Sequence, residues 1–81
     1  MLGAGYVGRG KLYLKQGRDG DARGEFEQAA KLDPQDPEAL YGRGIARKHL
    51  GDARGGDGDI ASAKRIDPMI ANFFQAFGIK E

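Results

Sequence analysis

The stretch Asp33-Pro34-Gln35-Asp36-Pro37-Glu38 decides the fold, because its first two residues recur 34 positions later as Asp67-Pro68. The same offset aligns identical or similar residues on both sides: Arg9-Gly10 with Arg43-Gly44, Gly17 with Gly51, Phe26 with Ile60, Ala29 with Ala63 and Leu32 with Ile66. A repeat of this length is typical of stacked supersecondary units. The 81 residues are therefore predicted to form one small domain, residues 1–81, built from repeats.

This stretch also predicts where helices end and begin. Proline disfavours the helical conformation in the residue before it, so a helix is expected to end at Asp33. Asp36 suits the N-cap position of the next helix, and Pro37 suits its first position. Gly17 can adopt the left-handed conformation that ends the first helix. We expect helices near residues 4–16, 20–32, 37–49, 57–66 and 68–77.

The residues around the stretch follow a recognisable pattern, which comprises Tyr6, Arg9-Gly10, Tyr13, Ala22, Phe26, Ala29 and Pro34. This pattern resembles the tetratricopeptide repeat (TPR), a helix-turn-helix unit. The resemblance implies an all-α fold, an α-α superhelix of two TPR helix-turn-helix hairpins with a C-terminal capping helix. Repeat one covers residues 3–36, repeat two covers residues 37–70, and the capping helix covers about 68–77.

The second repeat departs further from the family pattern. Arg47 stands where the family has tyrosine, and Gly56 stands where it has alanine. A glycine in a helix interior costs about 0.8–1 kcal/mol relative to alanine. Since Gly55, Gly56 and Gly58 lie close together, we expect a shortened helix that begins near Asp57.

The last predicted helix has an apolar face. Asp67-Pro68 is expected to start it, and Ile70, Phe73, Phe74 and Phe77 follow at i, i+3, i+4 and i+7 spacing. We expect Phe73, Phe74 and Phe77 to pack inward and to cover the end of repeat two, as terminal elements of solenoids do. The alternative is an exposed aromatic stripe that docks on another chain or on a membrane surface.

Three short motifs suggest other functions. The string Gly3-Ala4-Gly5-Tyr6-Val7-Gly8 is similar to nucleotide-sugar dehydrogenase fingerprints, but only two residues precede it and no buried strand can feed its turn. A fragment of a nucleotide-binding enzyme is therefore a distant alternative. Asp19-Gly20-Asp21 lacks the remaining oxygen ligands of a calcium loop, so it is expected to start a helix. The Arg-Gly pairs recur at the repeat spacing, which favours structure over a disordered RNA-binding tail.

Composition argues against catalysis. The chain has one histidine, His49, one serine, Ser62, and no cysteine, so neither a triad nor a metal site has enough parts. We expect no enzymatic activity, no cofactor and no metal. The formal net charge of +1 and the lack of a long apolar run predict no nucleic acid partner, no membrane partner and a cytoplasmic location.

The resemblance implies a protein-protein interaction module that binds a peptide or a partner helix in a concave groove. The groove positions of the family correspond here to Val7, Lys11, Leu14, Lys15, Tyr41, Ile45, Lys48, His49, Asn72 and Gln75, with Glu38 beside them. The carboxylate clamp of the family's chaperone-tail binders is absent, since Val7, Gly42 and Ala76 occupy three of its places. We expect a peptide with apolar anchors and some acidic character. The alternatives are a solvated helix face and a homo-oligomerising assembly domain that forms a weak homodimer.

Overall fold

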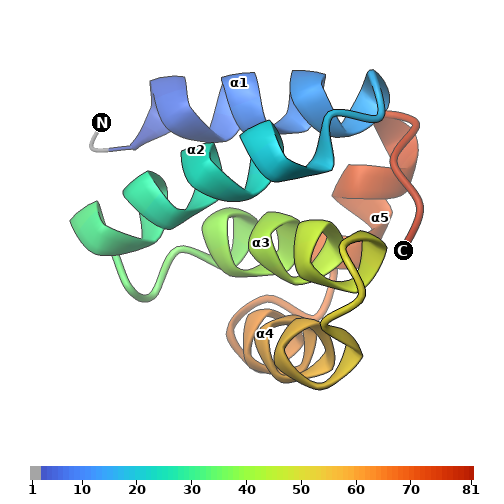
Figure 1. Cartoon of the computed structure of the whole chain (residues 1–81). Helices are drawn as coiled ribbons and strands as arrows, with labels where there is room; N and C mark the ends of the chain where they lie inside the picture. The colour runs from blue at the N-terminus through green and yellow to red at the C-terminus, as the bar shows by residue number, and fades with distance from the viewer. Residues whose placement is uncertain (1–2) are drawn as a thin grey trace.

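The computed structural model describes residues 3–81, which form helices and no strand. The helices are α1 (Ala4–Lys15), α2 (Asp19–Leu32), α3 (Pro37–His49), α4 (Ala53–Ile66) and α5 (Ile70–Ala76). Two antiparallel hairpins, α1 with α2 and α3 with α4, stack through contacts of α3 with both helices of the first hairpin. Figure 1 shows α5 (red) beside α3, at the end of the molecule where α1 also ends. The predicted all-α fold of two TPR-like hairpins and a C-terminal helix is confirmed.

Local sequence signals place the end of α1 and both ends of α3 close to the predicted residues. Gly17 ends α1 and Gly51 ends α3, both with a positive φ (76° and 96°) that other residues rarely adopt. Asp36 caps α3, since its carboxylate accepts a hydrogen bond of 2.9 Å from the backbone N–H of Glu38. Pro37 is the first helical residue, as predicted.

Several glycines allow helices to approach one another closely. A Cβ atom at Gly10 would lie 2.7 Å from the Phe26 ring, and one at Gly42 would overlap the same ring. A Cβ atom at Gly44 would lie 2.7 Å from the carbonyl oxygen of Gly56. The Phe26 ring therefore fits between α1 and α3 only because both helices present glycine to it.

The predicted start of the fourth helix near Asp57 was wrong, because α4 begins at Ala53. Asp52 caps this helix by accepting a hydrogen bond of 2.9 Å from the N–H of Gly55. Gly56 is buried against Gly44 of α3, where any larger residue would collide with the facing backbone. Capping and close packing thus offset the low helix propensity of the glycines.

The fifth helix is shorter than the predicted 68–77, because Asp67-Pro68 forms a turn rather than a helix start. Asp67 is extended, and its carboxylate accepts a hydrogen bond of 3.0 Å from the N–H of Met69. Asp33 forms the equivalent turn after α2, with a 3.1 Å bond from Gln35. The position that corresponds to the capping Asp36 is Ile70, which cannot cap, so α5 starts without a side-chain cap.

Only one edge of the predicted aromatic face of α5 is internal. Phe74 and Ile70 are buried, but Phe73 is 61% exposed and Phe77 is 42% exposed. The Phe74 ring centroid lies 4.8 Å from that of Tyr41 and 6.4 Å from that of Phe26. The prediction of an inward Phe73, Phe74 and Phe77 face was therefore right for Phe74 alone.

Candidate functional site

Eight of the ten predicted groove residues lie on α1 and α3, the first helices of the two hairpins. Four of these eight are apolar core residues, with exposed fractions of 7% or less: Val7, Leu14, Tyr41 and Ile45. The apolar side chains among the predicted groove residues are therefore covered rather than open to a ligand.

The cover over Tyr41 comes from the chain itself. Phe74 of α5 packs its ring on Tyr41 of α3. The Lys11 ammonium of α1 lies 5.3 Å from the Phe74 ring centroid and 5.6 Å from that of Phe77, and the Lys15 ammonium lies 4.9 Å from the Phe77 centroid. We call these three residues, Lys11, Lys15 and Tyr41, the α1/α3 face. α5 contacts α3 and α4 and reaches α1 through this face, so it does more than cover the end of repeat two.

The residues after α5 continue along the same face. Gly78 has a positive φ of 91° and turns the chain back, and the N–H of Ile79 donates a hydrogen bond of 2.9 Å to the carbonyl of Phe74. The Ile79 side chain is only 4% exposed. The hydroxyl of Tyr41 donates a hydrogen bond of 2.5 Å to the carboxylate of Glu81. Residues 70–81, which we call the C-terminal segment, thus present rings and a carboxylate to the α1/α3 face.

Burial and a neighbouring carboxylate shift the pKa of Tyr41. Burial, with the hydrogen bond to Glu81, raises the pKa of the Tyr41 phenol well above its ordinary value. The same hydrogen bond lowers the pKa of Glu81, and Lys64 at 3.5 Å lowers it further. Tyr41 is therefore a neutral hydrogen-bond donor at physiological pH, and Glu81 is an ionised acceptor.

The remaining predicted groove residues do not gather around Tyr41. His49 is directed toward α2, where its Nδ1 lies 2.9 Å from the carboxylate of Asp19. Lys48 pairs with Asp57 of α4 at 3.0 Å, which raises the pKa of Lys48. Asn72 and Gln75 are exposed on α5 itself. Of the predicted polar residues, Lys11 and Lys15 are the two whose ammonium groups lie over the rings of α5.

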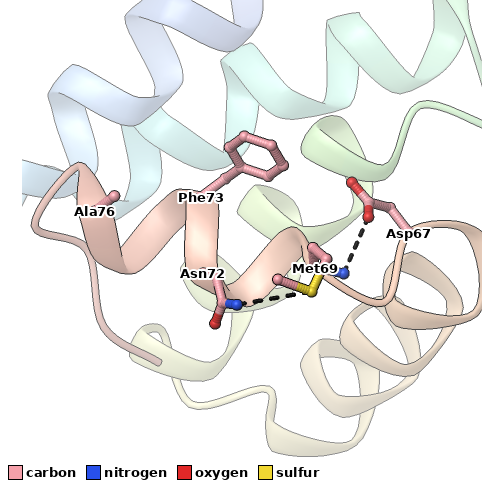
Figure 2. Close-up of a pocket in the computed structure, with 5 residues that line it drawn as sticks. All are labelled: Asp67, Met69, Asn72, Phe73 and Ala76. Carbon is pink, nitrogen blue, oxygen red and sulfur yellow. Dashed lines mark hydrogen bonds between the residues drawn. The ribbon is translucent and has the colours of Figure 1, made fainter.

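A second surface lies on the outer side of α5 and was not predicted. Figure 2 shows Met69, Asn72, Phe73 and Ala76 around a hollow of about 470 Å³ that Asp67 borders. Met69 is 55% exposed and Phe73 is 61% exposed. The signal was present in the sequence, because Met69, Phe73 and Ala76 have i, i+4 and i+7 spacing, one residue out of step with Ile70, Phe74 and Phe77.

A nearly buried ion cluster joins α3 to α4 and explains the unusual Arg47. Asp59 is 8% exposed and accepts two hydrogen bonds from Arg43, at 2.8 and 2.9 Å, and one from Arg47 at 2.9 Å. Its carboxylate raises the pKa of Arg43. The arginine that replaces the family's tyrosine therefore forms an ion pair inside the second hairpin, a structural role that the sequence analysis missed.

The described residues hold no constellation that would suggest a metal site. Within residues 3–81, no group of three histidine, aspartate or glutamate side chains is arranged to hold a metal ion. Gly3 is the N-cap residue of α1 and residues 4–8 lie within that helix, whereas the glycines of a dinucleotide fingerprint form the turn that opens a helix. In the same range, no helix is long and apolar enough to cross a membrane.

Comparison with known proteins agrees with this architecture. Residues 10–51 match a family model described as TPR repeat, and the match covers just over half of the chain. It spans most of the first hairpin and all of α3. Neither a curated protein nor a solved structure matches the chain.

Proposed function

Because the chain belongs to the TPR repeat family, whose members generally mediate protein-protein interactions, we propose that it binds a segment of another protein on its α1/α3 face. In this proposal the protein is a non-enzymatic interaction module. The partner segment carries an aromatic anchor and an acidic side chain.

The observation that supports this proposal is the chemistry of the α1/α3 face. Tyr41 offers a flat ring and a hydroxyl donor, and Lys11 and Lys15 place ammonium groups over the neighbouring rings. A cation over an aromatic face contributes about 0.5–1 kcal/mol at an exposed site. A hydrogen bond to a charged group contributes about 1.5–3 kcal/mol. A small surface of this kind fits a ligand of micromolar affinity.

A titration with a defined peptide tests the proposal. The probe is a twelve-residue peptide that copies residues 70–81, with acetylated and amidated ends so that the glutamate side chain is its one carboxylate. We expect the amide signals of Lys11, Lys15 and Tyr41 in the isotope-labelled full chain to shift at millimolar peptide, because residues 70–81 of the chain already lie on this face, and the affinity should weaken as salt rises. A matched peptide with alanine at the positions of Phe74, which is buried, and Phe77, which faces the lysines, should not bind. Shifts confined to α2, to α4 or to the outer side of α5 would contradict the proposal.

Self-association is a second candidate function, favoured by the exposed Met69 and Phe73 beside the hollow on α5. A second copy that covered this surface would form a weak homodimer. Sedimentation velocity over a hundredfold concentration range should then show a rising mass for the natural chain and a constant one for Phe73→Ser. A natural chain that stays monomeric throughout would exclude this candidate.

A further inference from the structure

The C-terminal segment, residues 70–81, depends on the rest of the protein for its structure. α5 has seven residues and no side-chain cap, and isolated helices shorter than about 12–15 residues are marginal in water. It is held by the buried rings and aliphatic side chains of Ile70, Phe74 and Ile79, and at its end by Glu81. The segment is therefore ordered only while it is packed on the α1/α3 face.

The burial of the C-terminal segment is uneven along its length. Phe74 is fully buried, whereas Phe77 is 42% exposed and the Glu81 side chain is 35% exposed. On either side of the buried Ile79, the far end is held by polar contacts: the Tyr41 hydroxyl and the Lys64 ammonium on Glu81, and the Lys15 ammonium over Phe77. Polar contacts at partly exposed positions are weak, because water competes for both partners. The contacts of Phe77 and Glu81 are therefore the weakest ones that the segment makes, and those of Ile70, Phe74 and Ile79 the strongest.

The same groups would be needed by the partner proposed above. Tyr41 has one hydroxyl proton, which Glu81 accepts, and one ring face packs on Phe74. A second aromatic and acidic segment cannot use these groups while the C-terminal segment is in place. Binding in cis and binding in trans are thus mutually exclusive.

We propose that residues 70–81 are a built-in competitor for the α1/α3 face, displaced by a protein segment that pairs an aromatic ring with a carboxylate. This inference rests on the proposed function, and it adds the chemistry of the partner and a means of regulation. The apparent affinity of the partner is then its intrinsic affinity multiplied by the fraction of molecules in which the segment is undocked.

The first measurement concerns the competitor alone. Glu81→Gln keeps the shape of a side chain that is 35% exposed and removes the charge that Tyr41 and Lys64 hold. We expect the Ile79 amide, which donates to Phe74 within the segment, to exchange with solvent about fivefold faster in this variant. The amide of Ala46 in α3 should be unchanged. Glu27→Gln on α2 makes the same charge change away from the face and should leave both amides as they were.

The second measurement is the affinity of the twelve-residue peptide for the full chain and for both variants. Weakening the competitor fivefold should tighten peptide binding to Glu81→Gln by about fivefold, with no change for Glu27→Gln. A peptide with glutamine at the position of the glutamate should bind about fivefold more weakly to every chain.

The outcomes separate the two proposals. Faster Ile79 exchange together with tighter binding supports the competitor. Unchanged exchange and unchanged affinity in Glu81→Gln would overturn it, even if the peptide binds on the α1/α3 face. Faster exchange with no peptide binding to any chain would overturn the proposed function, and the competitor role with it, while leaving the docking of the segment as a purely structural contact.

Discussion

Phe74→Ala should remove a large part of the folding free energy, and Phe73→Ala, one residue away, should remove little. The Phe74 side chain is 0% exposed, whereas that of Phe73 is 61% exposed. Truncation of a buried phenylalanine to alanine costs about 3–5 kcal/mol. The upper half of that range applies here, because the ring also packs on Tyr41 at 4.8 Å and near Phe26 at 6.4 Å, and such aromatic pairs contribute about 0.5–1.5 kcal/mol beyond burial.

The size of this loss must be compared with the total stability. Natural domains have about 0.05–0.15 kcal/mol of stability per residue, which gives about 4–12 kcal/mol for a chain of this length. Phe74→Ala should therefore remove between about a third and all of the unfolding free energy. Phe73→Ala should stay within about 0.5 kcal/mol of the natural chain, as for most surface substitutions.

Urea unfolding followed by circular dichroism at pH 7 measures both variants. With a slope of about 1 kcal/mol/M for a small domain, the Phe74→Ala midpoint should fall by about 4 M or more, and the Phe73→Ala midpoint by less than about 0.5 M. Phe74→Leu keeps most of the apolar volume and should lie between them. Equal midpoints for the two alanine variants, or a larger loss for Phe73→Ala, would refute the packing of α5 on Tyr41.

Three further perturbations test other parts of the structure. Asp59→Ala leaves Arg43 and Arg47 without their carboxylate, and we expect the free energy of unfolding in urea to fall by about 2–3 kcal/mol. The loss is smaller than for a fully buried pair because the arginines reach solvent. A change below about 0.5 kcal/mol would show that the cluster does not stabilise the fold. Gly42→Ala should destabilise the protein, because its Cβ atom would overlap the Phe26 ring. Gly58→Ala meets open space in a helix and should stabilise the protein by about 0.4–1 kcal/mol. Melting temperatures that shift in the same direction in both variants would contradict the close packing at Gly42. The pKa of Glu81 is lowered in the folded chain, because Tyr41 donates a hydrogen bond to its carboxylate. Its stabilisation is therefore present above the ordinary carboxyl pKa and lost as pH falls through the lowered pKa. The difference in melting temperature between the natural chain and Glu81→Gln should be present at pH 7 and disappear in acid, and a difference that stays constant as the carboxylates are protonated would refute the ionic contact.

The sequence by itself determined the repeat and most of its boundaries, because these depend on local chemistry. Pro37 preceded by Asp36 specifies a helix start, and Gly17 and Gly51 specify helix ends, through backbone conformations that neighbouring residues cannot change. The candidate groove came from the resemblance to the family, as a set of helix positions whose i+3 and i+4 spacing places them on one side of each helix.

The tertiary structure alone decided what occupies those positions. Gly56 weakens a helix taken alone, yet it is the residue that permits the contact with Gly44 on which α4 packs. α5 carries two apolar stripes, and its own sequence does not say which of them faces inward. Burial of Phe74 rather than Phe73 depends on Tyr41 of α3 and Lys11 of α1, which both lie against the Phe74 ring, and hence on contacts between residues far apart in the chain.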